Sequence, residues 1–257
     1  MVVPNFLAMF SGPSITFPGG DATNLMILRW IHFLAGITWI GLLYFFNLVN
    51  VPFMKEMDSA SKAKIIPSMM SRALWWFRWG AVVTVLVGLA YWGNGIVGID
   101  ASNGRGAGYA GASAGHVMGT FFLIWTIVFA VMYAAIMVVK INKGPVLGVI
   151  VAIVVAAGAY LFLDFNNHGW ESNRLLSIGV GGGMGWVMML NVWGIIWRMN
   201  KKIIAWNKDF ANNGTPIPPQ AAAMGRMGFL ASRANAWLSI FMLFFMGAAS
   251  HYPMLGR

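Results

Sequence analysis

Long uninterrupted runs of apolar residues are the main pattern along the chain. Each run is almost free of charged residues and is about 20 residues long or more, the length that a helix needs to cross ~30 Å of hydrocarbon. The spans expected from this pattern cover residues 25–52, 73–97, 114–140, 145–164, 173–198 and 235–253. The sequence therefore predicts an all-α integral membrane protein, a bundle of about six transmembrane helices.

Polar or glycine-rich segments separate these runs. The segment 94–115 is rich in glycine and predicts a loop, and "NNGTPIPPQ" at 212–220 predicts a break in a longer connection. The first 24 residues lack the charged start and the small-residue cleavage site of a secretory signal. We therefore expect residues 1–24 to be a retained outer segment and residues 25–257 to form one transmembrane domain.

The positive charges are concentrated in every second connection. These connections and the adjoining span ends contain Lys55, Lys62, Lys64, Arg72, Lys140, Lys143, Arg198, Lys201, Lys202, Lys208, Arg226 and Arg233. The opposite side has little more than Arg105, Arg174 and Arg257. Because basic connections stay in the cytoplasm, both termini are predicted on the outer, periplasmic side of a bacterial cytoplasmic (inner) membrane. This arrangement explains the net charge of +10 without nucleic acid as a partner.

Composition excludes several classes of protein. With 59% hydrophobic and 9% charged residues, the chain is unlike a soluble domain. It has no cysteine, which excludes disulfides, thiolate zinc sites, iron–sulfur clusters and covalently attached c-type haem within this chain. No carboxylate lies inside an expected span, which argues against a proton pump or a cation-coupled transporter. Asn47, Asn50 and Asn191 are expected to cross-link helices inside the membrane.

All four histidines are predicted at or near the outer face: His32, His116, His168 and His251. His32 follows the start of the first span by seven residues, which places it roughly 10 Å below the membrane boundary. His168 is expected in an exposed loop as a solvated residue. An imidazole at the depth of His32 is costly in hydrocarbon and therefore a candidate for function.

Glycines accompany the intramembrane histidines on their own helix faces. Gly36 follows His32 by one turn, and Gly247 precedes His251 by one turn. The absent side chains leave room for a flat group such as a porphyrin held by imidazoles from two helices. Arg29, one turn outward from His32, is placed to pair with a propionate.

These positions predict a b-type haem between His32 and His251, with His116 as the alternative ligand. Two other interpretations remain open. Membrane histidines also act as hydrogen-bonding groups, and glycines at four-residue spacing also pack helices closely. Copper is the other metal alternative, because Met118 and Met254 stand beside His116 and His251 and a thioether with imidazole suits that ion.

Three stretches resemble a known family: "LRWIHFLAGITWIGLLYFF" at 28–46, "WWFRWGAVVTVLVGLAYW" at 75–92 and "RANAWLSIFMLFFMGAASHYPM" at 233–254. They are similar to the membrane domain of bacterial membrane-bound urate hydroxylases, the urate oxidase N-terminal domain. The family motif carries over to Arg29, Trp30, His32, Gly36, Trp39, Gly41, Trp76, Trp79, Asn191, His251, Tyr252 and Pro253. In that family a periplasmic c-type cytochrome domain commonly follows, and the resemblance implies that a separate subunit supplies it here.

Two positions depart from the family pattern. Ile178 and Ala234 stand where the family carries histidines. The resemblance therefore implies an electron-transfer protein that binds haem b and works with a c-type cytochrome or a larger membrane oxidoreductase. The alternatives are a non-catalytic scaffold subunit of a membrane complex and a urate-oxidising enzyme. Loss of the two histidines disfavours the enzyme.

Overall fold

The computed structural model describes residues 19–256, and this part of the chain is helical without any strand. Six continuous helices are long and apolar enough to cross a membrane, as the sequence predicted. They cover Gly20–Glu56, Ser59–Gly106, Ala114–Val138, Gly144–Phe165, Asn173–Asn213 and Gln220–Ala248. The chain thus has the architecture of a multi-pass membrane protein. Of the expected outer segment, residues 1–18 lie outside the described residues and residues 20–24 already belong to the first helix.

Short π-helical stretches divide several of these helices. In chain order the elements are α1 (Gly20–Tyr44), η2 (Phe45–Asn50), α2 (Val51–Glu56), α3 (Ser59–Ile65), η3 (Ile66–Met70), α4 (Ser71–Trp92), η4 (Gly93–Val97), α5 (Gly98–Gly106), α6 (Ala114–Tyr133), η5 (Ala134–Val138), α7 (Gly144–Phe165), α8 (Asn173–Asn191), η6 (Val192–Ile196), α9 (Trp197–Asn213) and α10 (Gln220–Ala248).

Side chains and glycine fix where helices begin and end. The hydroxyls of Ser113 and Ser172 accept backbone N–H bonds in the first turns of α6 and α8. Asp58 does the same for α3, and its bonds from Ser61 lower the pKa of the Asp58 carboxyl. Gly214 ends α9 in the left-handed conformation with φ of 70°, which glycine adopts without strain.

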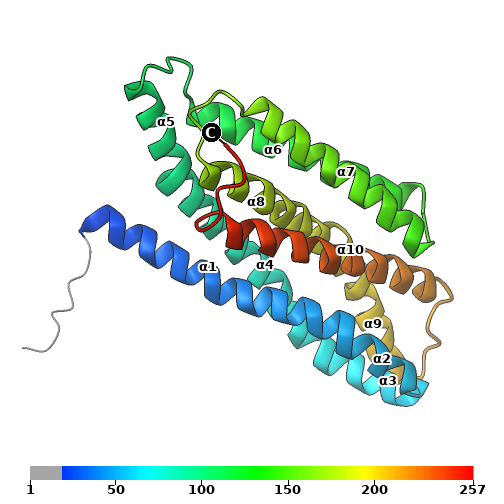
Figure 1. Ribbon diagram of the computed structural model, residues 1–257. Coiled ribbons are helices and arrows are strands. Elements are labelled where there is room, and N and C mark those ends of the chain that lie inside the picture. The colour runs from blue at the N-terminus through cyan, green and yellow to red at the C-terminus, as the bar shows by residue number, and fades with distance from the viewer. Residues whose placement is uncertain (1–18, 257) are drawn as a thin grey trace, which may run out of the picture.

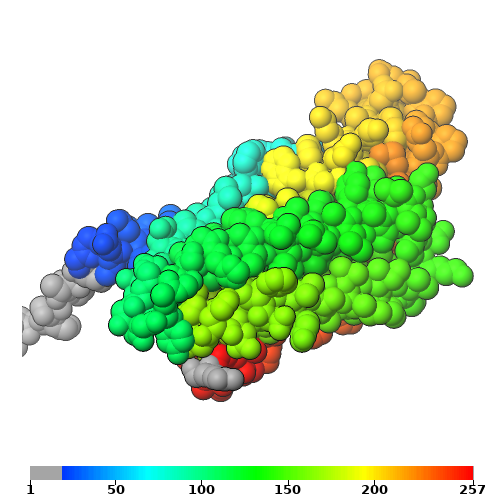
Figure 2. Space-filling view, turned by 90° about the horizontal axis from the view of Figure 1, so that it is seen from above, coloured from blue at the N-terminus to red at the C-terminus, as the bar shows by residue number. Residues whose placement is uncertain are grey.

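Helix α8 is the centre of the bundle. In the most apolar 18 residues of its span, 78% of the residues are buried, against 28–39% in the other five spans. Helix α10 packs along α8, α4 packs along α1, and α6 lies between α7 and α8 (Figure 1). Figure 2 shows α9 and the start of α10 standing out from the bundle at one end. Helices α2, α3 and α9 gather at that end, whereas α5 and the C-terminus lie at the other.

The expected loop at 94–115 is mostly helical, which corrects the prediction. Helix α4 continues through η4 and α5, and only residues 107–113 form the loop. Packing overrides the weak helix propensity of this segment. A Cβ atom on Gly104 would lie 2.9 Å from Cβ of Trp170, so the close approach requires glycine. Ser172 donates its hydroxyl to the carboxylate of Asp100 at 2.5 Å and ties α5 to α8.

Buried asparagines link the central helices, as expected for Asn47 and Asn191. Asn191 donates to Oδ1 of Asn235 at 3.0 Å, and Asn235 donates to the carbonyl oxygen of Met188 at 3.0 Å. Both asparagines are fully buried. Asn47 donates to the hydroxyl of Ser232 at 2.9 Å and joins the first span to α10.

Replacing Asn235 with leucine should destabilise the bundle by about 1–2 kcal/mol, because it removes two interhelical bonds and leaves Asn191 only its longer bond to the carbonyl oxygen of Ala231. Thermal unfolding in detergent, followed by circular dichroism, measures this change. Asn94→Leu is the matched control, since exposed Asn94 bonds only to Ala90 of its own helix. An equal loss in both variants would show that the Asn191–Asn235 link carries no special stability.

Candidate functional site

A cavity of about 430 Å³ opens between α1, α4, α8 and α10. Its size falls in the ~300–1,000 Å³ range of ligand-binding pockets. It is lined by residues 29–44 of α1, by the N-terminal part of α8, by the C-terminal parts of α4 and α10 and by Phe121 of α6. The start of α8 and the ends of α4 and α10 lie at the end of the bundle away from α2, α3 and α9 (Figure 1). The sequence-predicted residues Arg29, His32 and Gly36 all line this cavity.

His32 is held in one orientation by the neighbouring helix. Its Nδ1 atom lies 2.8 Å from the carbonyl oxygen of Thr84 on α4. A carbonyl oxygen only accepts hydrogen bonds, so Nδ1 carries the proton and donates it. The Nε2 atom then has a free lone pair, and among residues 19–256 it has no hydrogen-bond partner. A metal-binding histidine shows the same arrangement, with its second nitrogen bonded to a carbonyl or carboxylate.

Gly88 makes room for the imidazole ring of His32. A Cβ atom at Gly88 would lie 2.7 Å from Nδ1 of His32 and 2.8 Å from Cε1. Contacts this short do not occur between real side chains, so any larger residue would displace the ring. Glycine at this position therefore belongs to the site as much as the histidine does.

Two arginines from different helices line the cavity. Arg29 on α1 is exposed and lies 5.6 Å from the ring centre of Phe33. Arg174 on α8 is half-buried and donates to the hydroxyl of Tyr91. Within residues 19–256, no aspartate or glutamate lines the cavity. The lining thus favours a ligand that carries negative charge.

Two buried donors of the lining have no partner in the described part of the chain. These are Nε1 of Trp39, whose side chain is 1% exposed, and Nε of Arg174. Buried N–H groups are almost always hydrogen-bonded in folded proteins. Neither nitrogen is open to the cavity space itself, because each atom has almost no accessible surface.

Five glycines from three helices line the cavity, and their missing side chains leave its walls flat: Gly36, Gly41, Gly88, Gly182 and Gly185. A Cβ on Gly36 would approach only Thr84, at 3.6 Å, and one on Gly41 would meet nothing within 4 Å. A free imidazole nitrogen could bind haem iron, the two guanidinium groups could pair with propionates, and the flat apolar walls leave room for a porphyrin. The residues present therefore fit this group.

The other sequence-predicted residues lie outside the cavity lining. Helix α10 ends at Ala248, because Pro253 stops helical continuation and residues 249–251 form a turn. His251 is therefore exposed beyond the helix end, next to the lining residue Ser250, and not inside the span where it was expected. Gly247 is exposed, with nothing within 4 Å of an added Cβ.

His116 lies near His168, away from His32. It is exposed in the first turn of α6, and its ring centre is 5.4 Å from that of His168. The structure thus brings together Arg29, His32 and Gly36 but does not place His116 in the same cavity.

Sequence reasoning missed three contributors to the cavity: Thr84, Gly88 and Arg174. Nothing in the local sequence around Gly88 reveals its contact with His32, 56 positions away. Arg174 had a usable signal, because it is a rare arginine at the start of a span, opposite the end where most basic residues were expected. Ile178 also lines the cavity, so one of the two departures from the family pattern faces the site itself. Ala234, the other, is buried on α10 outside the lining.

No curated protein and no solved structure matches the chain significantly. The family model described as "Urate oxidase N-terminal" matches residues 56–256, more than three-quarters of the chain. The match includes α4, α8 and α10, which form three walls of the cavity, and it begins after α1, which carries His32. The matched length confirms the resemblance seen in the sequence: the chain belongs to the urate oxidase N-terminal family.

Proposed function

We propose that the protein is a membrane electron-transfer protein that binds a b-type haem in the cavity between α1, α4, α8 and α10. The observation that carries the proposal is the state of His32: Nδ1 is fixed on the carbonyl of Thr84 and Nε2 is left without a partner on a cavity wall. Haem supplies a one-electron redox centre when bound, and an apolar helical bundle is a common host for it.

Each lining residue has a role in this proposal. His32 provides the iron ligand, and the bond to Thr84 fixes its tautomer and ring plane. Gly88 provides the space in which the ring lies. Arg29 and Arg174 neutralise the propionates, and the apolar remainder of the wall excludes water, which raises the strength of these charge interactions.

The second iron ligand is a separate question. The cavity itself offers the thioethers of Met242 and Met246, and one of them would bind the iron together with His32, as histidine and methionine do in cytochromes c. His251, the partner expected from the sequence, stands one residue beyond the lining residue Ser250 and is not itself part of the lining. Loss of the low-spin spectrum in Met246→Ala or in His251→Ala identifies the ligand.

The proposal includes an orientation and a partner. The basic connections at the end with α2, α3 and α9 face the cytoplasm of a bacterial cell, so both termini and the cavity lie toward the periplasm. A haem near that face exchanges electrons with a periplasmic c-type cytochrome or a larger oxidoreductase of the inner membrane. Protease accessibility of a tag at the C-terminus in spheroplasts tests the orientation.

Oxidation of urate is the second candidate, favoured by the family and by the two arginines of the lining. Urate is planar and rich in acceptor atoms, which matches such a lining. Ile178 weakens this candidate because it puts an apolar side chain in the cavity where the family pattern has histidine. Urate-dependent reduction of cytochrome c by the purified protein would establish it.

Gly88→Ala should lower haem content at least about 10-fold, because the new Cβ pushes the His32 ring away from Thr84. Haem per chain after purification is the measurement, with elution volume as the test of folding. Gly119→Ala is the matched control, since its added Cβ meets nothing within 4 Å. Full haem content in a folded Gly88→Ala variant would contradict the proposed position of the haem.

A further inference from the structure

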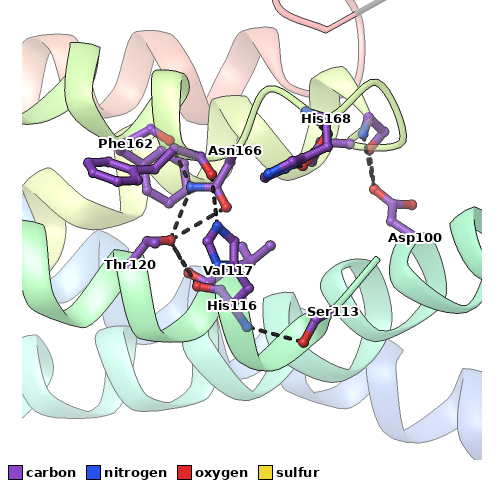
Figure 3. A network of polar contacts seen from close by, with 11 residues as sticks. Asp100, Ser113, His116, Val117, Thr120, Phe162, Asn166 and His168 are labelled. Carbon is purple, nitrogen blue, oxygen red and sulfur yellow. Dashed lines mark hydrogen bonds and ion pairs between the residues drawn. The ribbon is translucent and has the colours of Figure 1, made fainter. Parts of the chain in front are cut away.

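A pair of histidines lies outside the cavity, at the end of the bundle where α5, α6 and α8 meet (Figure 3). His116 belongs to the first turn of α6, and His168 belongs to the loop between α7 and α8. Their ring centres are 5.4 Å apart and the ring planes are inclined by 82°. Both residues are exposed to solvent.

One nitrogen of each ring is fixed by an acceptor. Nε2 of His116 lies 2.8 Å from the carbonyl oxygen of Phe165, and Nδ1 of His168 lies 2.7 Å from the carboxylate of Glu171. These nitrogens donate, because a carbonyl and an ionised carboxylate only accept. The remaining nitrogens, Nδ1 of His116 and Nε2 of His168, have no hydrogen-bond partner among residues 19–256. Metal-binding histidines are held in this way, by a carbonyl or carboxylate on the second nitrogen.

Glu171 is unusual because its carboxylate is buried without a lysine or arginine. Its side chain is 1% exposed, and within the described residues its only ion pair is with His168. It also accepts the backbone N–H of His168 at 3.0 Å. A buried carboxylate needs positive charge nearby. A cation on the far side of the imidazole provides that charge through the ring.

The loop that carries His168 is fixed against α6. Asn166 is fully buried and donates to the carbonyl oxygen of Phe162 at 2.7 Å and to the hydroxyl of Thr120 at 3.1 Å. Figure 3 shows this network beside the two imidazoles. The histidines are therefore presented from two rigid elements.

The spacing of the rings suits one shared ion. Two imidazoles bound at about 2.0–2.1 Å with a tetrahedral angle at the metal have ring centres roughly 5 Å apart. In residues 19–256 no group of three or more histidine, cysteine, aspartate or glutamate side chains is placed to hold a metal ion, so the two histidines would be the protein ligands of the ion. Water can supply the remaining ligands of the ion, because both histidines are exposed to solvent.

We propose that His116 and His168 bind a divalent transition-metal ion, with Glu171 as the residue that orients His168. Imidazole ligands suit Cu²⁺ and Zn²⁺, and copper forms the stronger complexes with a given set of ligands. The site is separate from the haem cavity, since neither histidine lines that cavity. The proposed metal site does not depend on whether the chain binds haem.

Copper titration of the purified, chelator-treated protein in detergent tests the site, with electron paramagnetic resonance as the readout. One Cu²⁺ should bind with hyperfine splitting from imidazole nitrogen, and excess Zn²⁺ should displace it. His168→Ala should weaken binding at least ~10-fold, and Glu171→Gln should weaken it about 10–100-fold. Asn167→Ala is the matched control, an exposed residue of the same loop that should leave the signal unchanged.

Elution volume and helical content establish that each variant is folded. If His116→Ala fails to fold, His168→Ala still decides the question, because His168 lies in an exposed loop. Equal copper affinity in wild type and folded His168→Ala would overturn the proposal. A copper signal without imidazole nitrogen would overturn it too.

Discussion

Replacement of His32 by alanine should reduce the haem content of the purified protein to less than about one-tenth of wild type. The imidazole is the only one that lines the cavity within residues 19–256, so its removal leaves no nitrogen ligand there. Without the imidazole only apolar contacts and the arginines would hold the proposed haem, because the iron would lose its nitrogen ligand and the ring that Thr84 orients would be gone. Haem per chain by the pyridine haemochrome assay is the measurement.

Two variants make this result specific to His32. His116→Ala removes an exposed imidazole outside the cavity and should retain full haem. His251→Ala should retain haem if a methionine of α10 is the second ligand and lose it if His251 takes that place. Full haem in a folded His32→Ala variant would remove the observation on which the proposed function rests.

Replacement of Gly183 by alanine should destabilise the bundle by about 3 kcal/mol or more. Gly183 lies on the buried face of α8 directly against the indole of Trp125, and an added Cβ would be 1.9 Å from Cε2 of that ring. Trp125 is fully buried, so it has no space into which to move. Helices α6 and α8 would have to separate, with loss of packing along both.

Unfolding in detergent, by heat or by increasing dodecyl sulfate, measures this loss. The control is Gly148→Ala on α7, whose added Cβ meets nothing within 4 Å and which should match or exceed wild-type stability. A Gly183→Ala protein that unfolds together with wild type would show that α6 and α8 are not packed as closely as described.

The spans were predictable because lipid imposes a minimum apolar length on any helix that crosses it. The loop prediction at 94–115 was wrong because glycine content reports local propensity, whereas the contact of Gly104 with Trp170 decides the outcome. The end of α10 was placed too late, at residue 253: the apolar run stops at Ala249, and the helix ends at Ala248 before a turn over residues 249–251.

The candidate site was predictable only within one helix. Arg29, His32 and Gly36 follow helical spacing and therefore share a face, which the sequence alone reveals. Thr84 and Gly88 act on His32 from another helix, and no periodicity reports such a pairing. The pairing of His32 with His251 required two helices to be placed against each other and stays a prediction.

Ile178 lies in the lining of the proposed haem cavity. The resemblance implies a histidine at this position in the family, which would place a second imidazole on the same wall. If the chain binds haem as proposed, Ile178→His should change the ligand field of the haem iron. An unchanged spectrum would show that position 178 does not contact the haem. Low-spin electron paramagnetic resonance of the purified variant distinguishes these results.

The measurement that tests the proposed function most directly is a dithionite-reduced minus oxidised absorption spectrum of the purified wild-type protein, with haem counted per chain. The proposal predicts a b-type spectrum and close to one haem per chain. A flat spectrum in protein made with sufficient haem supply would contradict it, and would make His32 a helix-packing group in a scaffold subunit.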